Sequence, residues 1–299
     1  MDLVSGRGVE VTIGSAVFKN PVFLASGPAG YGLEYETVID LAVLGGVVAK
    51  TITYKPLVGN RGARLRETPS GLLNSIGLEN VGCEAFLSEK LPAMVERGMR
   101  PIVSIGAEGW EDYERLLERL SGTEGFDAVE INLSCPNVDI GGMAVGRDPE
   151  LVEKYVRRAS EVLGGKCILA KLTPNVEDIV PLALSAEGAG ADGIVAVNTI
   201  VGMDIDVRNR KLVFDRVTAG LSGPAILPVA LAAVWKIARS VEIPVVGVGG
   251  ISSVDDALKF FMAGAAAVEV GTAIFYDPEL PVRIIERLEK DGIPERLSG

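Results

Sequence analysis

Histidine is absent from this 299-residue sequence, and cysteine is scarce. Without imidazole, any proton transfer near neutral pH must use Cys, Lys, Asp, Glu, Tyr or a cofactor. The three cysteines, Cys83, Cys135 and Cys167, form no C-x-x-C pair. They are too few for a disulfide framework and do not fit a zinc or iron–sulfur site. The sequence therefore predicts no metal centre in this chain.

The sequence also lacks an excess of basic residues, and its formal net charge is −11. This balance argues against a nucleic acid or an anionic membrane surface as a partner. No apolar run approaches the roughly 18 residues of a membrane span. The N-terminus has no basic-then-apolar signal pattern. We therefore expect a cytoplasmic protein. Aromatics make up only 5% of the residues, so small aliphatic side chains must fill its core.

Apolar segments of strand length alternate with segments of helical spacing along the whole chain. Residues 9–18 precede them and read as a short hairpin. This alternation predicts an α/β protein with one domain over residues 1–299, a single (β/α)8 TIM barrel. A doubly wound open sheet is the alternative, weakened because no G-x-G-x-x-G follows the first strand. The expected strands cover residues 21–26, 47–51, 101–106, 128–134, 168–173, 193–199, 244–250 and 267–272.

The expected helices lie between these strands, and two connections are much longer than the others. These connections, residues 52–84 and 200–224, are expected to form long loops over the C-terminal face of the barrel, and loops of this length are often functional. Helices are expected over residues 35–44, 111–120, 149–163, 176–188, 228–239 and 253–263, with one more ending near residue 98.

Polar residues and glycines stand where the expected strands end. In a TIM barrel these ends meet at one mouth, which holds the active site. Glycines at the last two tips allow backbone N–H groups to approach a phosphate closely. The sequence therefore predicts a phosphate-binding active site. The tips are Ser26, Lys50, Thr51, Ser104, Asn132, Lys171, Asn198, Thr199, Gly249, Gly250, Gly271 and Thr272.

Cys135 and Lys171 each admit two interpretations. Cys135 follows a strand within Asn132-Leu-Ser-Cys-Pro-Asn137; it is either a reactive thiol at the mouth or a packed, unreactive one. Lys171 is either a Schiff-base nucleophile of a lyase or a cation beside a flavin. A Schiff-base lyase has no evident need for a cysteine on the neighbouring strand, which favours the flavin.

Two longer motifs carry a resemblance to a known family. Asn132-Leu-Ser-Cys-Pro-Asn-Val138, followed by Gly141-Gly142 and Gly146-x-Asp-Pro149, resembles the class 1 dihydroorotate dehydrogenases. Residues 66–80, RETPSGLLNSIGLEN, resemble the substrate loop of that family. The strand tips follow the family's order over nearly the whole chain. The loop and the Gly-Gly pair are most similar to class 1B, the NAD-linked catalytic subunit.

This resemblance implies an FMN-dependent oxidation of dihydroorotate to orotate in pyrimidine biosynthesis, with Cys135 as the catalytic base. Ser104 departs from the asparagine that relatives commonly carry, which weakens that contact. The resemblance implies FMN binding by Ser26, Lys50, Thr51, Ser104, Asn132, Lys171, Val197, Gly223, Gly249, Gly250, Gly271 and Thr272. It implies substrate binding by Lys50, Asn74, Ser75, Ile76, Gly77, Leu78, Asn132, Asn198 and Thr199.

The resemblance also implies partners. The barrels are expected to form a homodimer, and a heterotetramer with a subunit that carries FAD and a [2Fe–2S] cluster and passes electrons to NAD. Alternative functions are a fumarate-linked class 1A enzyme, the flavin subunit of a dihydropyrimidine dehydrogenase, a Schiff-base lyase and a non-catalytic flavin carrier.

Overall fold

Eight parallel strands form a closed barrel in the computed structural model, which describes residues 9–134, 139–140 and 143–298. All eight expected strands are confirmed, and the open-sheet alternative is wrong. Around the barrel the strands run in the order β11, β12, β17, β18, β3, β4, β7, β8. They are β3 (Val22–Leu24), β4 (Gly46–Val48), β7 (Pro101–Ile105), β8 (Ala128–Asn132), β11 (Cys167–Leu172), β12 (Gly193–Ala196), β17 (Val245–Val248) and β18 (Ala267–Val270).

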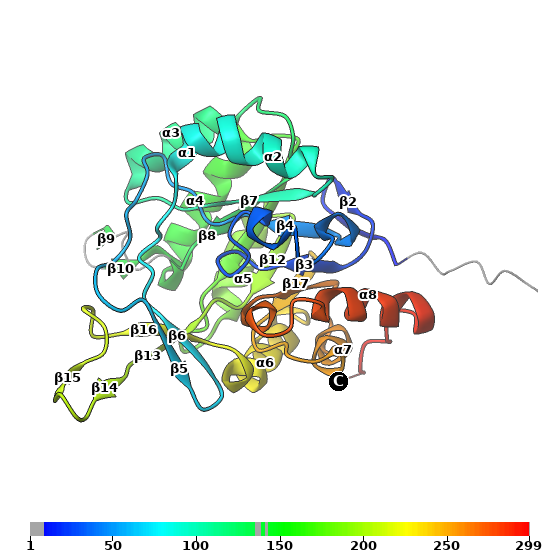
Figure 1. Ribbon diagram of the computed structural model, residues 1–299. Helices are drawn as coiled ribbons and strands as arrows, with labels where there is room; N and C mark the ends of the chain where they lie inside the picture. The colour runs from blue at the N-terminus through cyan, green and yellow to red at the C-terminus, as the bar shows by residue number, and fades with distance from the viewer. Residues whose placement is uncertain (1–8, 135–138, 141–142, 299) are drawn as a thin grey trace, which may run out of the picture.

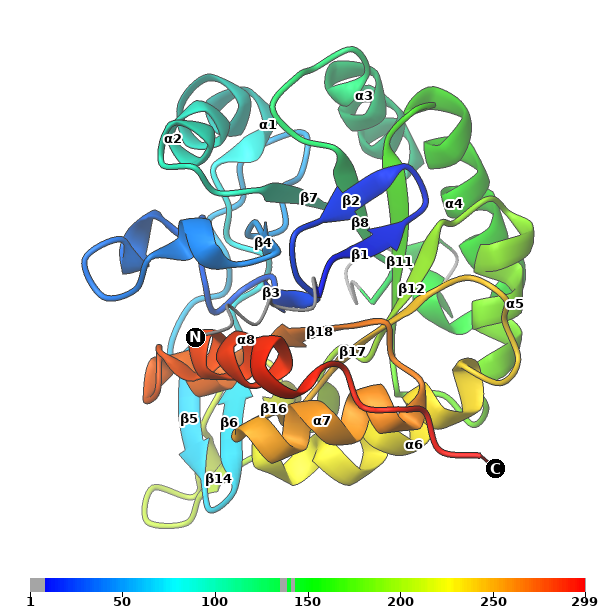
Figure 2. The same ribbon diagram turned by 90° about the vertical axis from the view of Figure 1, so that its right-hand side faces the viewer.

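Helices surround the barrel, as Figure 2 shows. The apolar strands are buried on both faces, which is why they read as continuous rather than alternating hydrophobic runs. The helices are α1 (Gly82–Ala85), a π-helical turn η3 (Phe86–Lys90), α2 (Leu91–Glu96), α3 (Trp110–Leu120), α4 (Pro149–Val162), α5 (Val180–Gly188), α6 (Leu227–Ile237), α7 (Val254–Ala263) and α8 (Leu280–Asp291). Short 3-10 turns η4 (Val145–Arg147), η5 (Pro224–Ile226) and η6 (Thr272–Phe275) connect them.

The N-terminal hairpin closes one end of the barrel. Strands β1 (Val11–Ile13) and β2 (Ala16–Phe18) pair antiparallel, as expected for residues 9–18. Side chains of this hairpin pack against the inward-facing apolar residues of the strands, and Figure 2 shows it lying across the barrel end. This inner cluster includes Ile13, Phe18, Phe23, Val48, Ile102, Ala128, Leu169, Val195, Val246 and Ala267.

A second sheet stands at the opposite end, beside the barrel mouth (Figure 1). The two long connections pair with each other there, in the strand order β13, β16, β6, β5. These strands are β5 (Leu65–Thr68), β6 (Gly71–Asn74), β13 (Ile200–Gly202) and β16 (Ala219–Ser222). Two further pairs of short strands are β9 (Asp139–Ile140) with β10 (Met143–Ala144), and β14 (Ile205–Asp206) with β15 (Lys211–Leu212). The expected loops thus contain a sheet that the spacing of the sequence does not predict.

The prediction of a helix over residues 35–44 is wrong. The structure has two 3-10 turns instead, η1 (Leu33–Tyr35) and η2 (Leu41–Val43). Asp40 adopts an extended backbone, and its carboxylate accepts a hydrogen bond from the backbone N–H of Ala42. Such a side-chain cap competes with the helix and starts a new turn. Helix α5 likewise begins at Val180 rather than at residue 176.

Candidate active site

One large cavity opens at the barrel mouth, beneath the β13–β16–β6–β5 sheet. Its volume is about 1030 Å³. Residues from both long connections and from the strand ends line it together, although they lie far apart in the sequence. The predicted site residues that line it are Ser26, Lys50, Thr51, Asn74, Ser75, Ile76, Gly77, Leu78, Asn132, Lys171, Val197, Asn198, Thr199, Gly223, Gly249, Gly250, Gly271 and Thr272.

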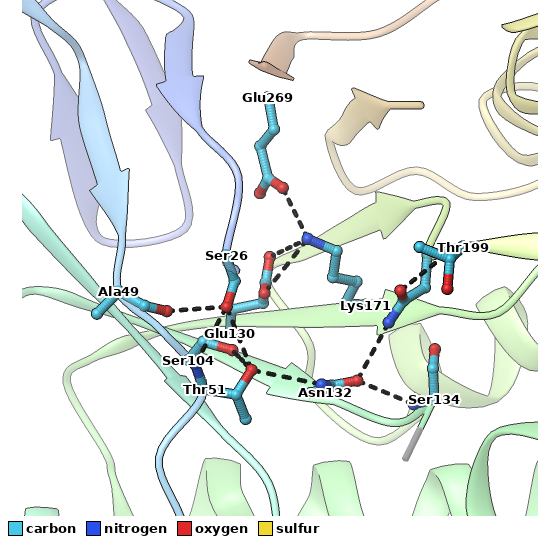
Figure 3. Close-up of polar contacts among 11 residues, drawn as sticks. Ser26, Ala49, Thr51, Ser104, Glu130, Asn132, Ser134, Lys171, Thr199 and Glu269 are labelled. Atoms are coloured by element: carbon cyan, nitrogen blue, oxygen red, sulfur yellow. Dashed lines mark hydrogen bonds and ion pairs between the residues drawn. The ribbon is translucent and has the colours of Figure 1, made fainter. Parts of the chain in front are cut away.

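Ser104 is the described member of the predicted set that does not line this cavity. Its side chain is fully buried on β7, and its Oγ lies 2.9 Å from Thr51 Oγ1. Thr51 Oγ1 in turn lies 3.2 Å from Ser26 Oγ, which donates to the carbonyl of Ala49. Ser104 therefore supports Thr51 from inside the barrel, in keeping with a hydroxyl's shorter reach (Figure 3).

The predicted asparagines form a connected hydrogen-bond chain. Asn198 Nδ2 donates to Asn132 Oδ1 at 3.3 Å, and Asn132 Nδ2 donates to Thr51 Oγ1 at 3.4 Å. Asn198 Oδ1 also accepts from the backbone N–H of Thr199 at 2.7 Å. These bonds fix the orientation of both amides at the cavity wall. Amides held in this way can discriminate between donors and acceptors on a ligand.

The substrate-loop segment reaches the cavity from the mouth sheet. Asn74, the last residue of β6, donates through Nδ2 to the carbonyl of Gly220 on β16 at 3.1 Å. A Cβ at Gly220 would lie 2.4 Å from Thr199 Oγ1. Only glycine at this position therefore allows the mouth sheet to lie so close to the end of strand β12. The amide of Asn60 donates to the backbone and side chain of Ser75, which holds the following turn.

Glycines at the strand tips allow the backbone to come close to a ligand at one corner of the cavity. Gly223, Gly249 and Gly250 have φ values of 90°, 129° and 80°, which favour glycine. A Cβ at Gly250 would lie 2.6 Å from the backbone nitrogen of Leu227, near the start of α6. As expected, helix α7 begins directly after this tip, where Ser253 Oγ accepts from the backbone N–H of Asp256. Helix starts beside glycine backbone suit a phosphate.

Lys171 forms two ion pairs inside the barrel. Its Nζ lies 2.8 Å from Glu269 Oε2 and 3.2 Å from Glu130 Oε2. Glu130 stands on the neighbouring strand β8, whereas β18, which carries Glu269, is three places from β11 in the barrel. Figure 3 shows the ammonium between the two carboxylates. All three side chains also line the cavity.

The sequence prediction missed both glutamates, although strand parity could have found them. Successive strand residues point to opposite faces. Glu130 therefore faces the same way as Asn132, two residues further on. Glu269 faces the same way as Ala267, which packs inside the barrel. The prediction considered only the last residues of the strands, whereas both glutamates stand earlier, within apolar strands.

These ion pairs favour one of the two interpretations of Lys171. Burial alone would lower the pKa of Lys171, but the charges of Glu130 and Glu269 outweigh burial and raise it. The ammonium therefore stays protonated. A Schiff-base lysine needs an unprotonated amine, so this geometry disfavours the lyase and suits a fixed cation on the cavity floor.

Cys135 lies outside the described residues, but the chain on both sides of it is held at the mouth. The backbone N–H of Ser134 donates to Asn132 Oδ1 at 3.2 Å. On the return side, a Cβ at Gly146 would lie 2.4 Å from the carbonyl oxygen of Leu133. Ser134 and Gly146, the described residues on either side of this segment, therefore both line the cavity. Cys83 and Cys167 are fully buried and do not line it.

Two further features concern the described part of the chain alone. Within residues 9–134, 139–140 and 143–298, no cluster of three or more His, Cys, Asp or Glu residues could hold a metal ion. Over the same residues, the helices are too short or too polar to span a bilayer.

Comparison with known proteins agrees with the motifs. The family model described as dihydroorotate dehydrogenase matches residues 8–291. A protein of Thermodesulfovibrio yellowstonii named dihydroorotate dehydrogenase B (NAD(+)), catalytic subunit, is 46% identical over 97% of this chain and 95% of its own length. Proteins with the same name are 47% identical in Solidesulfovibrio magneticus, over 90% of this chain and 88% of theirs, and 46% in Thermoanaerobacter sp., over 94% and 93%. The chain therefore belongs to the dihydroorotate dehydrogenase family.

Proposed function

We propose that this chain oxidises dihydroorotate to orotate in pyrimidine biosynthesis, with FMN bound at the barrel mouth. The observation that carries the proposal is the shared cavity: the described residues matched to this family's site, Ser104 apart, line one space of about 1030 Å³. Family membership over residues 8–291 supports the same reaction. The oxidation removes a proton and a hydride from adjacent carbons, so the site needs a base and a hydride acceptor.

The residues present fit FMN. The corner formed by Gly223, Gly249 and Gly250 brings backbone close to a phosphate, and Thr272 adds a hydroxyl beside Ser222, 2.8 Å away. The hydroxyls of Ser26 and Thr51 and the amide of Asn132 would meet the polar edge of the flavin ring. Gly271 and Val197 border the same space. Lys171 would supply a fixed positive charge on the cavity floor. FMN bound there would supply the hydride acceptor that this oxidation needs.

The substrate would lie against the amide chain. Lys50 is the cation that we assign to the carboxylate of dihydroorotate. Asn74, Asn132 and Asn198 would meet the ring's imide groups, with Thr199 and residues 75–78 closing the remaining sides. A ring matched in this way is preferred over analogues that would leave these polar groups unpaired.

Cys135 is the base that we assign to the proton on C5. A free thiol has a pKa of about 8.5, so it needs help to form the thiolate. Positive charge from Lys50 at the mouth, or closure of the site over the substrate, would provide this help. The connection that carries Gly71 and Gly77 would close over the substrate and exclude water when it binds. Gly141 and Gly142, which mark the alternative loop, lie outside the described residues.

We further propose that electrons leave through a second subunit that carries FAD and a [2Fe–2S] cluster, with NAD as the final acceptor. The words "NAD(+), catalytic subunit" in the names of the relatives support a separate partner. The barrels would pair as a homodimer within that heterotetramer.

Substrate choice tests this proposal. The purified chain should be yellow and should reduce an artificial dye with dihydroorotate, but much more slowly with 5,6-dihydrouracil, because the latter lacks the carboxylate for Lys50. The initial rates of dye reduction with each substrate measure this difference. A preference for dihydrouracil would contradict the proposed substrate and indicate the activity of a dihydropyrimidine dehydrogenase. Reduction of NAD by the chain alone would contradict the need for a partner, and reduction of fumarate would indicate a class 1A acceptor.

A further inference from the structure

Two carboxyl groups share one ammonium on the floor of the cavity. Glu130 and Glu269 are both fully buried, and the side chain of Lys171 is 7% exposed. If both carboxyls were ionised, the cluster would carry a net negative charge inside an apolar barrel. An uncompensated buried charge is costly, and such a group takes up a proton instead. The charge count therefore places one proton on this pair.

The hydrogen bonds indicate which carboxyl holds the proton. Both oxygens of Glu130 accept from Lys171 Nζ, at 3.2 and 3.5 Å. Glu269 accepts through Oε2 alone, whereas its Oε1 is buried with no hydrogen-bond partner among the described residues. An ionised Glu269 would keep part of its negative charge on an oxygen that nothing solvates, whereas a protonated Glu269 has no charge to solvate. Although the 2.8 Å bond to Glu269 Oε2 is the shortest of the three, the unsolvated Oε1 makes Glu269 the better place for the proton.

Among the described residues, the strands that pair with β18 carry no titratable side chain. The strands beside β18 are β17, Val-Val-Gly-Val, and β3, Val-Phe-Leu. Asp255, Asp256 and Lys259 of α7, which packs against β18, engage each other and Ser252 and Ser253. Burial, and next the nearby Glu130 carboxylate, raise the pKa of Glu269 to about 8, and Lys171 offsets only part of this rise.

We propose that Glu269 is a positioning residue that holds one proton, so that Lys171 keeps a single charged partner, Glu130, and the cavity floor carries no net charge. The consequence for the flavin rests on the proposed function. A neutral floor accepts the negative charge that FMN gains on reduction, whereas an ionised Glu269 would oppose it. Lys171 acts on the ligand, and the two glutamates act through Lys171.

Infrared spectroscopy of the full-length protein as purified tests the position of the proton. At pH 7 the spectrum should contain the carbonyl stretch of a protonated carboxylic acid, because exposed Asp and Glu are ionised there. Glu269→Gln should remove this band. Glu118→Gln, which changes an exposed glutamate on α3, should leave it intact. A wild-type spectrum without the band, or a band that persists in Glu269→Gln, would overturn the proposal.

Thermal unfolding then separates the two glutamates. Glutamine resembles a protonated carboxyl, so Glu269→Gln should change the melting temperature at pH 7 less than Glu130→Gln does. The pH dependence has a defined sign. The pKa of Glu269 is about 8 in the folded protein, against an ordinary value of 4.5. Between these two pH values the folded state therefore binds one proton more than the unfolded state. Stability from Glu269 is therefore lost as pH rises towards 8.

The difference in melting temperature between wild type and Glu269→Gln should accordingly shrink or reverse between about pH 5 and 8, and stay level above that range. If Glu130→Gln is the better tolerated change, or if this difference does not vary with pH, the proton is not on Glu269. These measurements require neither dihydroorotate nor turnover, so their failure is distinct from failure of the proposed function.

Discussion

Cys135→Ser should lower turnover at neutral pH by about 10²–10⁴-fold, the range that a general base contributes. A serine hydroxyl has a pKa several units above that of a thiol, so it is a poor acceptor for the C5 proton. FMN should remain bound, because no flavin contact is assigned to Cys135. The rate of flavin bleaching after anaerobic mixing with dihydroorotate measures the effect, and the flavin-to-protein ratio verifies retention.

Cys83→Ala and Cys167→Ala are the matched controls for this substitution. Both thiols are buried away from the cavity, and burial raises their pKa values to about 11 and about 12. They should stay protonated and inert, so their removal should leave the bleaching rate close to that of the wild type. Near-normal bleaching by Cys135→Ser would remove Cys135 from the proton transfer.

Lys171→Met should destabilise the protein and impair flavin binding together. Removing the ammonium leaves Glu130 and Glu269 buried without a cation, and breaking a buried ion pair costs about 3–5 kcal/mol. Protonation at low pH would neutralise the carboxylate charge that is left without a partner. The loss of stability should therefore be smaller at low pH and larger as pH rises. Chemical unfolding at several pH values and the flavin content of the purified variant measure these effects.

A surface control and a double variant show how much of the effect of Lys171→Met comes from the lost charge. Lys290→Met changes an exposed lysine on α8 and should shift stability by no more than about 0.5 kcal/mol. Lys171→Met combined with Glu130→Gln removes the charge left without a partner, and should recover much of the stability. It should not recover flavin reduction, because the cation is still missing. Full recovery of flavin reduction by the double variant would show that Lys171 acts only by neutralising Glu130, and not on the flavin.

The barrel and most of the cavity lining were predictable because each depends on local patterns. Buried parallel strands read as apolar runs, and in a closed barrel their last residues must meet at one end. Ser26, Asn132 and Lys171 could therefore be brought together without any knowledge of tertiary structure. Helix α8 lies beyond the last predicted strand and is not among the predicted elements.

The remaining features depend on contacts between distant segments. The mouth sheet pairs residues 72–74 with residues 220–222, and no local period reports such a pairing. The ion pairs of Lys171 join β8 and β18 across the barrel, so neither strand alone shows why it carries a buried glutamate. The helix predicted over residues 35–44 does not form because the side chain of Asp40 accepts a hydrogen bond from the backbone of Ala42. The spacing of apolar residues does not reveal such a bond.

One anaerobic single-turnover experiment tests the central claim most directly. One equivalent of dihydroorotate is mixed with the wild-type flavoprotein in the absence of any acceptor, and flavin absorbance and orotate are measured in the same sample. The proposed function predicts that the yellow colour bleaches and that one orotate forms for each flavin reduced. Flavin that stays oxidised while dihydroorotate is recovered unchanged would contradict it.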